Sequence, residues 1–96
     1  MADVGPVVHN EAQGRFEISR EGMLARLDYR LKDKVMLLTH TEVPKELAGG
    51  GVGGSLVRAA LEHARNTGLQ IVPLCSFVSV YLRRHPEYSD LIAPSR

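Results

Sequence analysis

The sequence predicts a single α/β domain with the element order β-β-β-α-β-α, in which helices pack against a mixed sheet. Three consecutive runs in the first half show strand patterning, and a glycine-rich turn after them leads into a helix, a strand and a second helix. The chain has 96 residues, of which 44% are hydrophobic and 24% charged. That length allows one hydrophobic core and leaves no room for a separate substrate domain. We expect a flexible start over residues 1–12, one domain over 13–92 and a tail over 93–96.

Residues 15–19, 23–31 and 35–43 are expected to form an antiparallel meander of three strands. The run 23–31 alternates between apolar and charged side chains, which is typical of a strand with one wet face. The run 35–43 opens as a continuous apolar block, and this predicts a central strand that is buried on both faces. Pro44 ends that strand because proline offers no ladder donor. The apolar set of the second strand is Met23, Ala25, Leu27, Tyr29 and Leu31.

A helix is expected between the glycine-rich stretch 47–55 and Gly68. Its apolar residues recur at helical spacing, so they predict one inward stripe. Gly68 can adopt the left-handed conformation that ends many helices. The inward stripe consists of Val57, Ala60, Leu61 and Ala64.

Residues 69–75 are typical of a fourth strand, which is joined to the third through the helix. Such a connection favours a parallel neighbour and a right-handed crossover. Pro73 lies inside this run, so we expect an edge strand or a strand that leaves its neighbour. Ser76 can cap a second helix over 77–84, which must stop before His85-Pro86.

The composition argues against several classes of function. The formal net charge is +1 and no run of lysine and arginine stands out, so no nucleic-acid surface is expected. The chain has one cysteine, which cannot form an intrachain disulfide, and no apolar stretch of membrane-spanning length. The four histidines and the cysteine lack zinc-type spacing, so no metal site is expected. These features predict a cytoplasmic protein without a membrane partner.

The glycine-rich stretch is the most distinctive part of the sequence, because five of the nine glycines lie within residues 47–55. Glycines allow backbone N–H groups to converge, and a helix start adds free donors and a positive dipole end. The stretch therefore predicts an anion-binding cradle; the alternative is a flexible loop without a ligand.

Two common phosphate-binding motifs do not fit this stretch. Gly49, Gly51 and Gly54 have the spacing G-x-G-x-x-G, but a dinucleotide site needs an acidic residue at the end of the next strand. That strand ends in Leu74-Cys75-Ser76. A P-loop needs Gly-Lys-Ser/Thr after the glycines, and this sequence lacks it.

The stretch from Ala48 to Gly53 resembles the pyrophosphate loop of the GCN5-related N-acetyltransferases, written R/Q-x-x-G-x-G/A. Three further segments share the resemblance, namely 40–44, 73–78 and 85–88. Together they resemble the small, single-domain, YjdJ-type acetyltransferase-like proteins of that superfamily. The resemblance covers residues 14–92. One departure is Ala48, which stands where the family usually has arginine or glutamine.

The resemblance implies a minimal acetyltransferase-like layer with a splayed sheet, in which acetyl-CoA enters where strands three and four diverge. It implies transfer of the acetyl group to an amine, which is a small molecule or a protein. The pantetheine arm would pair with backbone at Thr41, Glu42 and Val43. The phosphate cradle would consist of Gly49, Gly50, Gly51, Val52, Gly53 and Gly54. Ala48 would contribute no side chain to the diphosphate.

Cys75 and His40 are the candidate catalytic residues. Cys75 lies at a predicted strand end just before a helix, where the helix dipole favours a thiolate, so it could accept the acetyl group or lie beside the thioester. His40 shares the parity of Met36 and Leu38 on the third strand and could take a proton from the attacking amine. In the splayed fold both would face one cleft. The alternatives are a buried apolar cysteine and a partly buried structural histidine.

Further residues of the last helix are candidates for cofactor contacts. Tyr81 could protonate the departing CoA thiolate, or pack against Phe77 instead. Ser76 and Arg84 could contact the cofactor, although arginine at a helix end is usually surface charge. Glu42 is an alternative base.

The first hypothesis for function is an acetyl-CoA-dependent N-acetyltransferase. The second is a module that binds CoA or acyl-CoA without turnover, and the third is a structural domain without a ligand. We expect a monomer or a weak homodimer.

Overall fold

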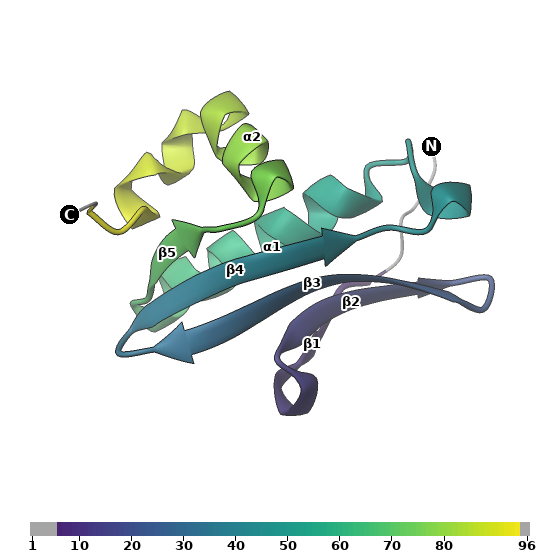
Figure 1. Ribbon diagram of the computed structural model, residues 1–96, viewed down its shortest axis with the longest axis horizontal. Coiled ribbons are helices and arrows are strands. Elements are labelled where there is room, and N and C mark those ends of the chain that lie inside the picture. The colour runs from purple at the N-terminus through teal and green to yellow at the C-terminus, as the bar shows by residue number, and fades with distance from the viewer. Residues whose placement is uncertain (1–5, 95–96) are drawn as a thin grey trace.

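Five strands form one mixed sheet in the order β1-β2-β3-β4-β5 (Figure 1). The computed structural model describes residues 6–94. The pairs β1–β2, β2–β3 and β3–β4 are antiparallel, and β4–β5 is parallel. The elements are β1 Val8–Asn10, β2 Arg15–Arg20, β3 Met23–Lys32, β4 Val35–Glu42, α1 Val52–Thr67, β5 Gln70–Pro73 and α2 Ser76–Arg84. Short 3-10 helices cover Glu11–Gln13, Lys45–Leu47 and Pro86–Leu91 (η1, η2 and η3). The predicted α/β class and the parallel crossover between β4 and β5 are confirmed.

The N-terminal part of the chain adds a strand that the sequence analysis did not predict. Residues 8–10, assigned to a flexible start, form β1 and pair with residues 15–17 of β2. Asn10 accepts a hydrogen bond from the backbone of Gln13 and so caps η1, and Gly14 turns the chain with a φ of 67°. Three residues are too few to show an alternating pattern, so β1 has no signal in the sequence. Residues 1–5 of the expected flexible start lie outside the described residues.

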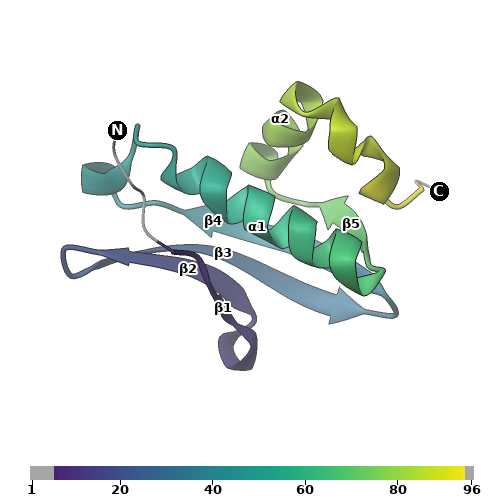
Figure 2. The same cartoon turned by 180° about the vertical axis from the view of Figure 1, so that it is seen from behind.

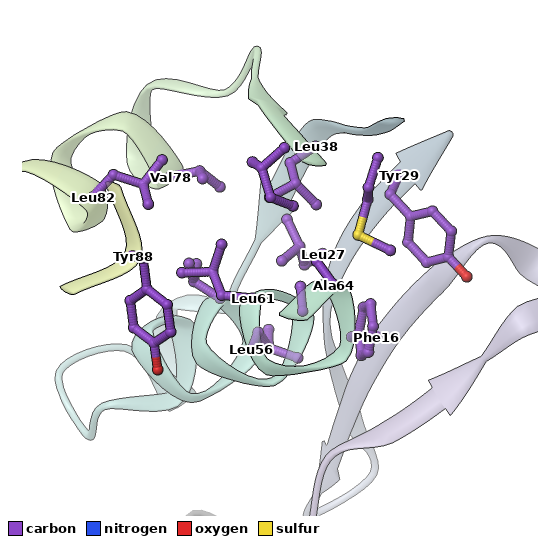
Figure 3. Packing of buried hydrophobic residues seen from close by; sticks show 14 of the residues in the cluster. Phe16, Leu27, Tyr29, Leu38, Leu56, Leu61, Ala64, Val78, Leu82 and Tyr88 are labelled. Carbon is purple, nitrogen blue, oxygen red and sulfur yellow. The ribbon is translucent and has the colours of Figure 1, made fainter. Parts of the chain in front are cut away.

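One face of the sheet carries the hydrophobic core. Figure 2 shows α1 lying along the sheet with α2 and η3 beside it, and Figure 3 shows side chains from both helices converging with those of the strands. Leu56, Leu61 and Ala64 of α1 are fully buried, as is Val78 of α2. The predicted inward stripe is confirmed, since Val57, Ala60, Leu61 and Ala64 all belong to the core.

The opposite side of the sheet, which we call the open face, is lined by ion pairs. Arg26 contacts Asp28 and Glu42 there, and Arg15 contacts Glu17. The prediction that the third strand is buried on both faces is therefore only half right. Met36 and Leu38 of β4 are fully buried, whereas Val35 and Leu37 on the open face are half-buried.

A β-bulge reverses the facing of the last residues of β4. Tyr29 pairs with Leu38, but the next residue of β3, Asp28, pairs with His40, so Thr39 is an extra residue on β4. Beyond this point Thr41 pairs with Leu27 on the core face. The expectation that His40 shares the face of Met36 and Leu38 is therefore wrong, because one inserted residue exchanges the two faces of a strand.

The segment after α2 is docked on the core, and residues 95–96 of the expected tail lie outside the described residues. Tyr88 and Leu91 of η3 are buried. Beyond η3, the backbone N–H of Ala93 donates to the carbonyl of Ile71 at 2.8 Å, so the chain runs along the outer edge of β5. Arg65 of α1 holds η3 through Asp90 and through the carbonyl of Glu87.

Replacing Tyr88 with phenylalanine tests how η3 is attached. The Tyr88 hydroxyl donates to Glu62 at 2.6 Å, so its loss leaves a half-buried carboxylate without that donor. We expect Tyr88→Phe to lower the free energy of unfolding by about 1–2 kcal/mol. Urea unfolding measures this as a lower midpoint with an unchanged m-value. Tyr81→Phe is the matched control, because the Tyr81 ring stacks on His85 and this contact does not need the hydroxyl. An equal loss of stability in Tyr81→Phe would contradict the role given to the hydrogen bond between Tyr88 and Glu62.

Candidate functional site

The sheet opens between β4 and β5 immediately after their last pair. That pair is Leu38 with Pro73, and the backbone N–H groups of Leu74 and Cys75 both donate to the Leu38 carbonyl, at 3.0 and 3.1 Å. β4 then continues to Glu42, whereas β5 has ended. The predicted splay is confirmed, and among the described residues no strand pairs with the backbone of residues 39–42 on that side.

The glycine turn next to this opening is shorter than predicted. Gly49 and Gly51 have φ values of 87° and 82°, in the left-handed region that favours glycine, and a Cβ at either position would meet open space. α1 begins at Val52, so Gly53 and Gly54 lie in its first turn instead of in the loop. Glycine is a poor helix former, so the sequence did not indicate that α1 begins as early as Val52.

The start of α1 supplies free backbone donors. The helical ladder begins with the hydrogen bond from the N–H of Ser55 to the Gly51 carbonyl, at 3.0 Å. The N–H groups of the residues before Ser55 have no acceptor within the helix, and the helix dipole adds positive potential at this end. The geometry therefore fits an anionic group such as a diphosphate.

A cavity of about 300 Å³ joins the glycine turn to the end of β4. Its lining is mostly apolar and consists of Val43, Ala48, Gly49, Gly51, Val52, Gly53, Gly54 and Phe77. The structure thus brings together most of the predicted cradle with Val43 of the predicted pantetheine segment. Gly50 is exposed next to this cavity and is not part of its lining.

Phe77 is the cavity residue that sequence analysis did not assign to the site. It is 43% exposed, and a Cβ on Gly53 would lie 2.6 Å from its ring. The only signal in the sequence is its place in the first turn of the helix that follows Cys75. The close approach explains why glycine stands at position 53.

A double-mutant cycle tests the contact between Gly53 and Phe77. In the Phe77→Ala background, Gly53→Ala should stabilise the fold by about 1 kcal/mol, since alanine is the better helix former. With Phe77 present, the added Cβ displaces the ring, so most of this gain should disappear. Thermal unfolding of the four proteins measures the coupling energy, and equal effects of Gly53→Ala in both backgrounds would contradict the contact.

Cys75 lies on the core side of the opening, with its thiol toward Thr41. The Sγ atom is 3.4 Å from Thr41 Oγ1. The Cys75 thiol donates to this oxygen. Burial acts to raise the pKa of the thiol, but the Thr41 hydroxyl and the nearby backbone N–H groups of Phe77 and Val78 favour the thiolate, so the pKa is lowered. Cys75 itself is the N-cap of α2, so Ser76, predicted as the cap, is instead the first helical residue and is exposed.

His40 lies on the open face and contacts a different set of residues. Its Nε2 atom is 3.3 Å from Glu42 Oε1, and Glu42 also pairs with Arg26 Nη2 at 3.2 Å. The side chains of His40 and Glu42 are 56% and 57% exposed. The bulge therefore separates the two predicted catalytic side chains, since Cys75 contacts Thr41 on one face and His40 contacts Glu42 on the other.

The remaining candidates of α2 are Tyr81 and Arg84. Tyr81 stacks on His85, with ring centroids 4.0 Å apart, and this contact replaces the predicted packing on Phe77. A Cβ on Gly54 would lie 3.6 Å from the Tyr81 ring, so Tyr81 does reach the start of α1. Burial raises the pKa of Tyr81, which keeps its hydroxyl protonated. Arg84 is exposed in the last turn of α2.

Within residues 6–94, no three side chains of histidine, cysteine, aspartate or glutamate lie close enough together to hold a metal ion. None of the helices described there has the length and hydropathy needed to cross a bilayer.

Comparison with known proteins identifies the family. Residues 15–91 match the family model described as GCN5-related N-acetyl-transferase. The chain belongs to the GCN5-related N-acetyltransferase family. The fold is similar to the solution NMR structure of a GCN5-like protein from Staphylococcus aureus, with a TM-score of 0.75 and 31% sequence identity. That match covers 99% of this chain and 94% of the other.

The GCN5-related N-acetyltransferase match spans the elements that build the opening. It begins at the start of β2 and ends with η3, so it contains the splayed strands, the glycine turn and both helices, while β1 precedes it. The departure at Ala48 is visible in the structure, where this residue lines the cavity without a polar side chain. In this member of the GCN5-related N-acetyltransferase family, Ala48 and the glycines therefore offer backbone groups and no polar side chain to the cavity.

Proposed function

We propose that this protein transfers an acetyl group from acetyl-CoA to an amine. The observation that carries the proposal is the meeting of three features at one end of the sheet: the free backbone edge of β4, the left-handed glycine turn and the first turn of α1. Each suits a different part of acetyl-CoA. The edge of residues 41–43 can pair with the amide groups of pantetheine, and the turn with α1 can hold the diphosphate.

On the core side of the opening, Cys75 is the proposed group beside the thioester. Its lowered pKa favours a thiolate. The Thr41 hydroxyl, which accepts from the thiol at 3.4 Å, would rotate to donate to that thiolate. In a covalent route, Cys75 Sγ would attack the acetyl carbon, a C–S bond to the protein would form, and the C–S bond to CoA would break. The CoA thiolate would leave and take up a proton, for which the Tyr81 hydroxyl is the candidate donor. In a direct route, Cys75 would only line the site.

On the open face, His40 and Glu42 form the proposed proton-accepting pair. The amine would approach from this side, lose a proton to His40, and attack the acetyl carbon through the opening. A C–N bond would form as the C–S bond to Cys75 (covalent route) or to CoA (direct route) breaks, and that sulfur would leave as a thiolate. Glu42 would stabilise the imidazolium that results, because its carboxylate is within 3.3 Å. The sequence predicted that Cys75 and His40 face one cleft. In the proposal they would instead act from opposite faces of the sheet, through the opening between β4 and β5.

Titration with CoA and acetyl-CoA is the first test. Isothermal titration calorimetry should detect binding of both, and amide NMR shifts should concentrate at residues 41–43 and 49–54. Turnover is then measured as free thiol released from acetyl-CoA with a panel of primary amines. Absence of CoA binding at millimolar ligand would refute the proposal.

Ala48 favours a second candidate, a module that binds CoA or acyl-CoA without turnover. A position that usually carries a diphosphate contact has no polar side chain here. Binding without acetyl transfer to any amine of the panel would support this candidate. A cytoplasmic location and a monomer or weak homodimer stay predictions of the sequence.

A further inference from the structure

A cluster of four aromatic rings holds the edge strand β1 against the core. It consists of His9 of β1, Phe16 of β2, Tyr29 of β3 and His63 of α1, and we call it the His9 cluster. The His9 ring stacks on Phe16 with centroids 4.2 Å apart and meets His63 edge-on at 4.5 Å. Its Nε2 atom is 2.6 Å from the Tyr29 hydroxyl. None of these four residues belongs to the proposed acetyltransferase site.

Besides its backbone pairing with β2, β1 has few side-chain attachments to the described part of the protein. It is three residues long, and Val8 on the open face is 54% exposed. The second side-chain attachment is Asn10, which donates to Glu17 at 2.9 Å. Hydrogen bonds from Arg15 and then from Asn10 lower the pKa of Glu17, so this carboxylate stays ionised through mildly acidic pH. Of the two attachments, only the His9 cluster therefore changes charge between neutral and mildly acidic pH.

The groups around His9 disfavour a positive charge on its ring. Phe16 from β2 offers no counter-charge, Tyr29 from β3 is a neutral phenol, and His63 from α1 becomes a like charge when it is protonated. Within residues 6–94, the only acidic group that faces His9 is Glu11 of η1, at 4.0 Å from Nδ1, and its side chain is 77% exposed. A contact so open to solvent is strongly screened.

We propose that His9 is a proton-operated latch, and that acidification releases β1 from the sheet while β2 to β5 stay folded. A cavity of about 430 Å³ already lies beside the His9 cluster, lined by His9, Glu11, Gly14, Tyr29, Leu31 and His63. Water can therefore reach an imidazolium as it forms. Release would enlarge this cavity and expose Phe16 and Tyr29 at the end of the core seen in Figure 3.

The direction of the pH dependence follows from the surroundings of His9. Burial, and then repulsion by His63, lower the pKa of His9, and the pull of Glu11 does not compensate. The folded strand therefore binds a proton less readily than the released strand does. The stability of the attachment is fully present above the ordinary histidine pKa of about 6.5 and is lost as the pH falls through the lower value of the folded state.

Amide hydrogen exchange of the whole protein by NMR tests this latch. Between about pH 7.5 and pH 5, after correction for intrinsic rates, protection of residues 8–10 should fall by about tenfold, while protection of β3 and β4 should not change. His9→Phe keeps the stacked ring without the titration, so its β1 should stay protected at both pH values. Equal protection of wild-type β1 at both pH values would overturn the proposal.

A second variant keeps the test decisive if His9→Phe weakens β1 by itself. His63→Phe preserves the edge-on packing and removes the like charge, so the loss of protection at acidic pH should become smaller than in the wild type. The chemical shifts of the His9 ring report its pKa directly in the same samples. An unchanged loss in His63→Phe, with His9 titrating at its ordinary value, would contradict the latch.

Discussion

Cys75→Ala is expected to lower the rate of acetyl transfer by about 10²-fold or more while CoA binding stays intact. The thiol lies 3.4 Å from the Thr41 hydroxyl, and alanine removes the nucleophile without adding bulk. Mass spectrometry of the protein mixed with acetyl-CoA should show an added acetyl group in the wild type and none in the variant. Unchanged turnover with a good amine would remove the covalent role of Cys75.

Thr41→Val is the companion variant, because it keeps the shape of the side chain and removes the hydroxyl that faces the thiol. The hydrogen bond from Thr41 is one of the interactions that lower the pKa of Cys75, so its loss should raise that pKa. The rate of alkylation of Cys75 should then be lower at neutral pH, and its pH profile should move to higher pH. An unshifted profile would show that Thr41 does not tune the thiol.

A double substitution of Gly49 and Gly51 by valine is expected to weaken CoA binding by about 10²-fold. Both positions have φ above 80°, where a β-branched side chain is strained by about 1–2 kcal/mol, and every 1.4 kcal/mol is a factor of ten in affinity. The strained turn would relax to another conformation, and its N–H groups would no longer converge. Isothermal titration calorimetry with CoA measures the change.

The chain offers a matched control in Gly22 and Gly68. They have φ values of 77° and 72° with open space around them, but Gly22 lies in the turn between β2 and β3 and Gly68 ends α1. The double valine variant at these positions should lose comparable stability and keep its affinity for CoA. If it lost affinity as well, global destabilisation would explain both results.

The long periodic segments could be predicted from the sequence. Alternation along 23–31 and the helical stripe on α1 placed β3 and α1 correctly, because burial on one face imposes a period over many residues. The sequence also predicted that the glycine turn lies next to the point where β4 and β5 diverge. The predicted start of α1 was too late, since Gly53 and Gly54 disfavour helix but lie in its first turn, close to Phe77 and Tyr81 of α2.

Features that depend on tertiary contacts could not be predicted. β1 is a strand because β2 offers it an edge and because His9 fits among Phe16, Tyr29 and His63. The bulge at Thr39 leaves no trace in the pattern of β4, so parity counting assigned His40 to the wrong face. The sequence predicted that His40 and Cys75 lie near neighbouring strand ends. It could not predict that they lie on opposite faces of the sheet, because this depends on the single inserted residue Thr39.

The extra residue in β4 has a consequence for how such a protein can diversify. Under the proposed function, side chains toward the helices would contact the thioester donor and those on the far side would meet the acceptor, so the sheet would separate the two recognition surfaces. Charge-altering changes at Arg26, Asp28 or Glu42 leave the glycine turn and its surroundings untouched. New acceptors could be selected on one side of the partition without retuning the donor on the other.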